Sequence, residues 1–295
     1  MFNNKLLTLK TLNFKRIKMG ESKSDINRRQ FLRNGAVAVV ALGAVGVGAN
    51  YLKKLNIENA ATLLRPPGAV NEKEFVYACI KCGLCVQICP IEAIKLAGIS
   101  DGLSYGTPYI DPRSQACDFS CDAMQCIETC PTSALDFIPF KTAGEEAYVA
   151  YNKANPTPGP DYNPIAVQSK AMKANTKMGL AVINSSTCLA VQGKGFKGAP
   201  REEGFKGIYR SPNPKLNERK ASPVNDHLFN SEICNLCVTE CPIGDTAIIM
   251  DESIGTDGKT NWKPKILDGC TGCGVCVMVC PSKPDTIIIE KLETA

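Results

Sequence analysis

The sequence predicts an α+β fold built from two similar modules in tandem. Fifteen of the sixteen cysteines fall into four tight groups, two in each half of the body of the chain. Stretches such as residues 274–280 suit one or two helical turns. Short β-branched segments flank the cysteine groups, at 93–99, 134–138, 247–250, 263–267 and 286–290. The pattern is therefore strand, cysteine loop, short helix and strand, repeated.

Composition changes divide the chain into five segments. They are a basic leader at 1–49, a linker at 50–71, a first module at 72–140, a Pro-rich connector at 141–177 and a second module at 178–295. The sequence Arg-Pro-Pro-Gly at 65–68 breaks any helix in the linker. In the connector, residues 143–153 can form a short helix, and the prolines of 155–164 predict a stretch without regular structure.

The leader resembles a twin-arginine export signal. Arg28 and Arg29 precede Gln-Phe-Leu, and an uncharged run rich in Ala, Val and Gly follows at 35–49. At about 15 residues this run fits the apolar part of a signal peptide and is too short to span a bilayer. An ordinary buried helix is the alternative, but so much glycine and valine makes a poor helix. The resemblance implies recognition by the twin-arginine translocase and a periplasmic protein, and an uncleaved leader would remain as a membrane anchor.

The net charge of +5 comes from this leader. Residues 1–49 hold nine Lys or Arg and two Asp or Glu, whereas the remaining residues hold 25 basic and 27 acidic ones. Met19 is an alternative start that keeps both arginines. The body of the chain is thus slightly acidic, which does not fit nucleic-acid binding. The single histidine, His227, excludes sites built from several histidines, and its Pro/Asn/Asp-rich surroundings predict a surface position.

Two cysteine runs carry the chemistry. Both have the spacing Cys-x2-Cys-x2-Cys-x3-Cys-Pro, one at 79–90 and one at 270–281. This run is the bacterial ferredoxin signature for [4Fe–4S] clusters, in which the fourth cysteine ligates the neighbouring cluster. Two complete copies predict a protein that carries electrons.

Two further groups depart from this spacing but keep its Cys-Pro ending. The second group is Cys117-x3-Cys121-x4-Cys126-x3-Cys130-Pro. The third is Cys234-x2-Cys237-x3-Cys241-Pro, one ligand short. The remaining cysteine, Cys188, lies 46 positions before Cys234, and including it gives four ligands for each of four clusters.

Exchange of the fourth ligand between neighbouring runs then predicts the complete ligand sets. Cluster one takes Cys79, Cys82, Cys85 and Cys130; cluster two takes Cys117, Cys121, Cys126 and Cys89; cluster three takes Cys188, Cys234, Cys237 and Cys280; cluster four takes Cys270, Cys273, Cys276 and Cys241. No catalytic residue is predicted.

Other interpretations of the cysteines are a disulfide framework, structural zinc and, for Cys188 alone, a free thiol. Closely spaced Cys-x2-Cys-x2-Cys triplets make poor disulfide partners, and zinc needs only four ligands in one tetrahedral site. Residues 193–198 satisfy Gly-x-Gly-x-x-Gly, but Ala-Pro follows where a dinucleotide-binding site needs a helix. We expect a flexible basic loop there.

With its leader and four cysteine groups, the chain resembles the MauM/NapG family of ferredoxin-type electron-transfer proteins. The resemblance rests on Arg28-Arg29, the four Cys-Pro endings and the split third group, and covers the leader and residues 72–292. It implies a periplasmic carrier that receives electrons from a membrane-bound, ferredoxin-type quinol-oxidising protein. It also implies delivery toward a periplasmic reductase or its cytochrome, in the nearest branch nitrate reductase.

Three alternatives remain open. The chain could be the iron–sulfur subunit of a molybdopterin oxidoreductase, an enzyme with its own substrate site, or a maturation or redox-sensing protein. Use of all sixteen cysteines as ligands disfavours an enzyme, since no cluster keeps an open position for a substrate.

Overall fold

The computed structural model describes residues 63–121, 124–157, 159–212, 220–254 and 260–291. Residues 52–295 belong to one compact unit. Its α-helices are α2 (Glu72–Ala78), α3 (Leu84–Ile88), α4 (Gln125–Glu128), α5 (Ile138–Ala154), α6 (Pro164–Ala174), α7 (Leu236–Thr239) and α8 (Val275–Val279). Two 3-10 helices, η1 (Ile99–Ser104) and η2 (Val224–Asp226), accompany them. The mixture of helices and strands agrees with the α+β expectation.

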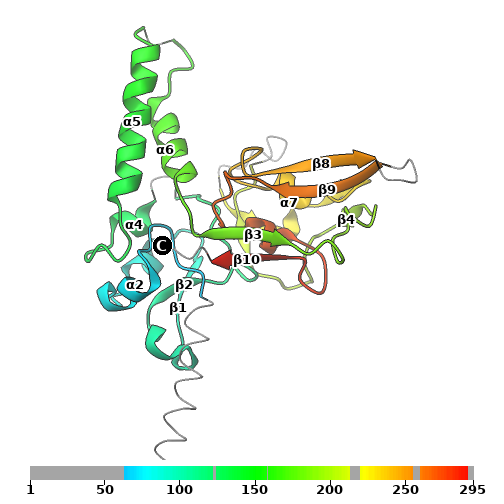
Figure 1. Cartoon of the computed structure of the whole chain (residues 1–295), viewed down its shortest axis with the longest axis horizontal. Helices are drawn as coiled ribbons and strands as arrows, with labels where there is room; N and C mark the ends of the chain where they lie inside the picture. The colour runs from blue at the N-terminus through cyan, green and yellow to red at the C-terminus, as the bar shows by residue number, and fades with distance from the viewer. Residues whose placement is uncertain (1–62, 122–123, 158, 213–219, 255–259, 292–295) are drawn as a thin grey trace, which may run out of the picture. The chain divides into compact units, whose positions relative to one another are not determined.

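The strands form antiparallel pairs, which are β1 with β2, β3 with β10, β4 with β7, β5 with β6 and β8 with β9. Their bounds are β1 Ile94–Leu96, β2 Pro108–Ile110, β3 Gly179–Ile183, β4 Phe196–Gly198, β5 Ile208–Tyr209, β6 Ser222–Pro223, β7 Phe229–Ser231, β8 Ile248–Ile254, β9 Thr260–Ile266 and β10 Ile287–Lys291. In Figure 1, α2, α4, β1 and β2 gather on one side, α7, β8 and β9 on the other, and β3 and β10 lie between them.

Each cysteine group leads into a very short helix that bears one of its cysteines, Cys85 in α3, Cys126 in α4, Cys237 in α7 and Cys276 in α8. Helices α3 and α4 contact each other, and so do α7 and α8. A strand then follows in three of the four repeats, namely β1, β8 and β10. The strand expected at 134–138 does not form: Leu135 makes an isolated bridge to Ala69, and α5 begins at Ile138 with Pro139 in its first turn.

The connector is more ordered than expected. The helix predicted at 143–153 is part of the longer α5. The last proline of the stretch expected to lack regular structure, Pro164, instead begins a second helix, α6. Asn163 caps α6 by accepting a hydrogen bond from the Ala166 N–H, so proline stands where its missing N–H costs nothing. Helices α5 and α6 lie side by side (Figure 1).

Two residues expected at the surface or in a linker are buried. Arg65 is 4% exposed and donates to Glu72, Ser104, Thr107 and the Pro108 carbonyl, so residues 63–71 are integrated into the fold. His227, expected at the surface, is 2% exposed, because its ring packs on Tyr209 with centroids 4.7 Å apart.

One hydrophobic core serves both halves. It contains Phe75 and Ile127 from the first half and Tyr209, Leu236 and Met278 from the second. The strip 112–118 joins them: Gln115 exchanges two hydrogen bonds with the Ile208 backbone, and Ala116 donates its N–H to the Met278 sulfur. The division into ferredoxin-like modules at 72–140 and 178–295 stays a prediction.

Candidate iron–sulfur sites

Left-handed backbone at two fixed positions shapes the two complete cysteine runs. In the first run Lys81 and Gly83 have φ of 59° and 76°, and in the last run Gly272 and Gly274 have φ of 71° and 86°. The residues correspond, two and four positions after the first cysteine. Such residues turn the chain sharply, so that consecutive cysteines face one space.

The irregular second group keeps the same two turns. Phe119 follows Cys117 by two positions with φ of 59°, and Met124 precedes Cys126 by two positions with φ of 57°. The extra residues of this group therefore lie between these turns. A non-glycine residue in this region is uncommon, and Met124 starts α4 as Gly83 starts α3.

A second recurring turn follows the Cys-Pro endings. Glu92, Ser133 and Gly244, each three positions after a cysteine, have φ of 53°, 53° and 82°. This turn directs backbone N–H groups toward the preceding sulfur. Ala93 donates to the Cys89 sulfur at 3.4 Å. Burial raises the pKa of Cys130, but the N–H groups of Leu135, Thr132 and Ala134, together with the Thr132 hydroxyl, outweigh it and lower that pKa overall.

Three cavities are each lined by four cysteines, and each set combines different runs. The first is lined by Cys79, Cys82, Cys85 and Cys130. The second is lined by Cys188, Cys234, Cys237 and Cys280. The third is lined by Cys241, Cys270, Cys273 and Cys276. Among the described residues, no three Cys, His, Asp or Glu side chains meet closely enough to hold a single metal ion.

The other four cysteines are also neighbours. Burial raises the pKa of Cys126, and nearby Cys121 and Cys89 raise it further. Burial and then Cys126 raise the pKa of Cys117 in the same way. Cys126 thus lies within electrostatic reach of Cys89, Cys117 and Cys121. The predicted export residues Arg28 and Arg29 lie outside the described residues.

Three long-range contacts hold the segment around Cys188 beside its cavity. Strand β4 pairs with β7, which brings residues 196–198 beside 229–231, and the Cys234 N–H donates to the Lys194 carbonyl. Thr286 donates its hydroxyl to the Thr187 carbonyl, next to Cys188. The Gly-x-Gly-x-x-Gly segment at 193–198 therefore contains strand β4, and no helix directly follows it.

Burial makes these sites unfavourable for uncompensated thiolates. It raises the pKa of Cys85 to about 11, of Cys234 to about 11 and of Cys273 to about 12, with neighbouring cysteines adding to the effect. Metal ligation requires the thiolate, so bound iron must supply the compensating positive charge. Four cysteines around one buried space, with N–H donors to sulfur, fit a [4Fe–4S] cluster.

A buried polar group beside Cys241 could not be predicted from sequence. The Glu240 carboxylate accepts hydrogen bonds from the hydroxyls of Tyr209 at 2.8 Å and Ser211 at 2.5 Å. His227 pairs through Nε2 with the Ser222 hydroxyl at 2.7 Å. These residues come from distant segments without a motif, so only their packing reveals the group.

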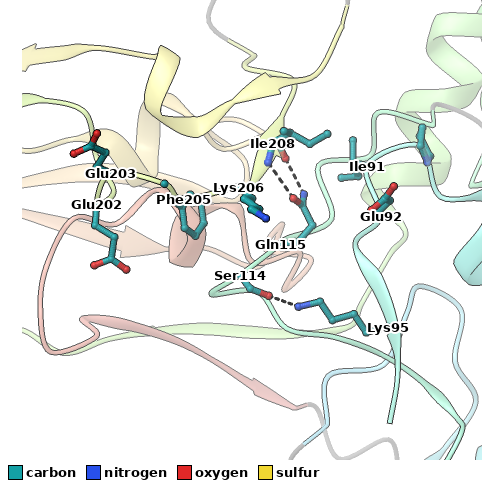
Figure 2. Close-up of a pocket in the computed structure, with 13 residues that line it drawn as sticks. Ile91, Glu92, Lys95, Ser114, Gln115, Glu202, Glu203, Phe205, Lys206 and Ile208 are labelled. Carbon is teal, nitrogen blue, oxygen red and sulfur yellow. Dashed lines mark hydrogen bonds between the residues drawn. The ribbon is translucent and has the colours of Figure 1, made fainter. Parts of the chain in front are cut away.

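An open groove of about 570 Å³ lies between residues 90–95, 114–115 and 202–208. Figure 2 shows that two of its polar side chains bond within its walls, Lys95 to the Ser114 hydroxyl and Gln115 to the Ile208 backbone. Their evident role is to join the strip 112–118 to its surroundings.

Comparison with known proteins supports the cysteine chemistry. The family described as "4Fe-4S dicluster domain" matches residues 78–154 and 233–283. The "Ferredoxin-type protein NapG" of Escherichia coli K12 is 29% identical over 278 residues, covering 93% of this chain and 90% of the relative. The "Methylamine utilization ferredoxin-type protein MauM" of Methylophilus methylotrophus is 30% identical over 259 residues, covering 88% and 81%.

No solved structure matches. Within the described part of the chain, no helix has the length and apolar character needed to cross a membrane. The cysteine runs lie within the segments matched by the 4Fe-4S family, and the two relatives cover 93% and 88% of the chain. The chain belongs to the MauM/NapG family of ferredoxin-type electron-transfer proteins with 4Fe-4S domains.

Proposed function

We propose that this protein is a periplasmic electron carrier holding four [4Fe–4S] clusters, with the sixteen cysteines as ligands in the four sets predicted above from the runs. The observation that carries the proposal is the grouping of cysteines from separate runs around shared cavities. Cys130 joins the first run in one cavity, and Cys241 joins the last run in another. A substrate site of its own is not part of the proposal.

The neighbour relations support one spatial order of the clusters. Helices α3 and α4 carry ligands of clusters one and two, and α7 and α8 carry ligands of clusters three and four. Between the halves, the Cys117 N–H donates to the Cys273 carbonyl at 3.1 Å, which joins cluster two to cluster four. The order is therefore one, two, four, three, which differs from the order along the chain.

Electrons enter from a membrane-bound ferredoxin-type protein that oxidises quinol and leave toward a periplasmic reductase or its cytochrome, with nitrate reductase as the proposed acceptor. The family resemblance and the twin-arginine leader support this route. Each cluster's potential is set by local charge, by hydrogen bonds to sulfur and by solvent exposure. The N–H donors to Cys89 and Cys130 act on clusters two and one.

The leader is tested by changing Arg28 and Arg29 together to Lys, which keeps the charge. We expect the protein to accumulate in the cytoplasm with its iron content unchanged, measured by fractionation and iron analysis. Arg33→Lys is the matched control, outside the arginine pair. Normal export of the double variant would contradict recognition by the twin-arginine translocase.

The function is tested by isolating the tagged full chain anaerobically from solubilised membranes at low salt and identifying stoichiometric partners by mass spectrometry. We expect about sixteen irons per chain and a polytopic iron–sulfur membrane protein. A stoichiometric molybdopterin subunit would instead make this chain the fixed electron-transfer arm of that enzyme.

A further inference from the structure

Several apolar side chains are exposed around cluster one. Ile80, Leu84 and Leu96 are 62%, 42% and 46% exposed, yet all three line the cavity of cluster one. Tyr105 is 51% exposed and lies under the Lys81 ammonium, 5.8 Å from its ring centroid. We name these four side chains the cluster-one face.

This face surrounds the most accessible ligand position. Among the sixteen cysteines, all of which lie in described residues, Cys82 alone is exposed. Cys82 lines the same cavity as Ile80, Leu84 and Leu96. Cluster one is also a terminal member of the proposed order, so an electron entering or leaving the chain there passes through this face.

The described part of the chain begins beside this face. Leu64, at the start of the described residues, makes a β-bridge to Ile110 of β2, and β2 pairs with β1, which carries Leu96. Residues 50–63 separate Leu64 from the apolar run 35–49. Fourteen residues reach at most about 50 Å when extended, so a leader held in the membrane keeps Leu64 within about that distance of it.

From the apolar rim, the exposed Cys82 and the short tether together, we infer that the cluster-one face docks on an electron-donating protein embedded in the membrane. This inference rests on the proposed function and adds where the donor binds. The partner must present an apolar surface around its own redox centre, because Ile80, Leu84 and Leu96 offer no charge to pair. Contact with lipid alone would bury the same side chains but supply no electrons.

The test uses the full chain with its clusters, added to native membrane vesicles stripped of it, with duroquinol as reductant. Leu96→Glu and Leu96→Lys are compared with Leu228→Glu and Leu228→Lys, since Leu228 is 74% exposed and lies in the segment leading to β7. Either charge at position 96 must be desolvated on docking, so both variants should be reduced about tenfold more slowly than wild type. A change in cluster potential would move the two variants in opposite directions.

Because Leu96 lines the cluster-one cavity, iron content and the rate of reduction by dithionite are measured for all four variants, and the duroquinol rate of each is expressed relative to its own dithionite rate and iron content. In parallel, a photoreactive side chain at position 96, but not at 228, should crosslink to a membrane-spanning protein in those vesicles. Wild-type rates in both Leu96 variants, opposite effects of the two charges, or crosslinks to lipid alone would each overturn the inference. If position 96 crosslinked to a protein but duroquinol did not reduce the wild type, the docking inference would stand and the proposed electron route from quinol would be wrong.

Discussion

The backbone N–H of Cys117 donates a hydrogen bond to the carbonyl oxygen of Cys273 at 3.1 Å. This contact joins a cysteine loop of the first half directly to one of the second. Next to it, the Ala116 N–H donates to the Met278 sulfur at 3.4 Å, and Gly274 packs on Pro112. The two halves therefore meet at their cysteine loops, where the proposed electron path crosses between them.

Cys188→Ser is expected to remove cluster three and lower the iron content from about sixteen to about twelve per chain, because a cubane needs its fourth ligand. Iron analysis and the visible absorbance of the purified protein measure this. Cys276→Ser, in a complete run, is the reference for loss of one cluster. Full iron content in the Cys188 variant would identify Cys188 as a buried thiol.

Arg113, from the first half, contacts the second half through hydrogen bonds and an ion pair. Its guanidinium donates to the carbonyls of Val277 and Cys280 at 3.0 Å each and pairs with Asp285 at 2.9 Å. Arg113→Ala should lower the free energy of unfolding by about 2–4 kcal/mol, since charged hydrogen bonds are lost and carbonyls stay unpaired. Guanidinium unfolding measures the change.

Asp285→Asn is the control for Arg113, because the Asp285 carboxylate is half exposed and its ion pair should contribute less than about 1 kcal/mol. Arg113→Lys keeps the charge but not the planar fork and should be intermediate. Equal losses for Arg113→Ala and Asp285→Asn would show that the carbonyl contacts do not matter.

Gly274→Ala and Gly83→Ala compare equivalent positions of the two complete runs. Both glycines have left-handed backbone. A Cβ at Gly274 would lie 2.3 Å from the Pro112 Cβ, whereas a Cβ at Gly83 would have no heavy atom within 4 Å. Gly83→Ala should cost about 1–2 kcal/mol from backbone strain alone. Gly274→Ala should cost a further 1–3 kcal/mol from overpacking. Equal unfolding midpoints would contradict the tight packing at Pro112.

Glu72 links the beginning and end of the described chain. Burial alone would raise its pKa, but hydrogen bonds from Arg65 and Lys291, with their charges, outweigh it and lower that pKa below the ordinary 4.5. A depressed folded-state pKa contributes stability above the unfolded value and loses it as pH falls through the folded value.

Glu72→Gln should therefore reduce the free energy of unfolding at pH 7 by about 1–3 kcal/mol, and its difference from wild type should shrink below pH 4.5. Circular dichroism during guanidinium unfolding measures both. Glu74→Gln, exposed on the same helix, should have little effect. If the difference between variant and wild type stayed constant with pH, the loss of stability would not come from the ionisation of Glu72.

Local spacing determined the fold class, the turns and the chemistry that the family comparisons support. The turns at Lys81, Gly83, Gly272 and Gly274 lie within single cysteine runs, so a few adjacent residues are sufficient to encode them. The helix at 143–153 was predictable because its signal also lies in adjacent residues. Helix α6 was missed because the proline-rich stretch before it ends in Pro164, its first residue.

The cysteine count predicted that Cys188 shares a cluster with Cys234, but only the tertiary structure decided how the distant segments meet. Pairing of β4 with β7 brings Cys188 and Cys234 to one cavity, and the Cys117–Cys273 contact orders the cysteine groups in space. His227 is buried because Tyr209, from another segment, covers it. Such contacts depend on the packing of the whole unit, and no periodicity or spacing along the chain records them.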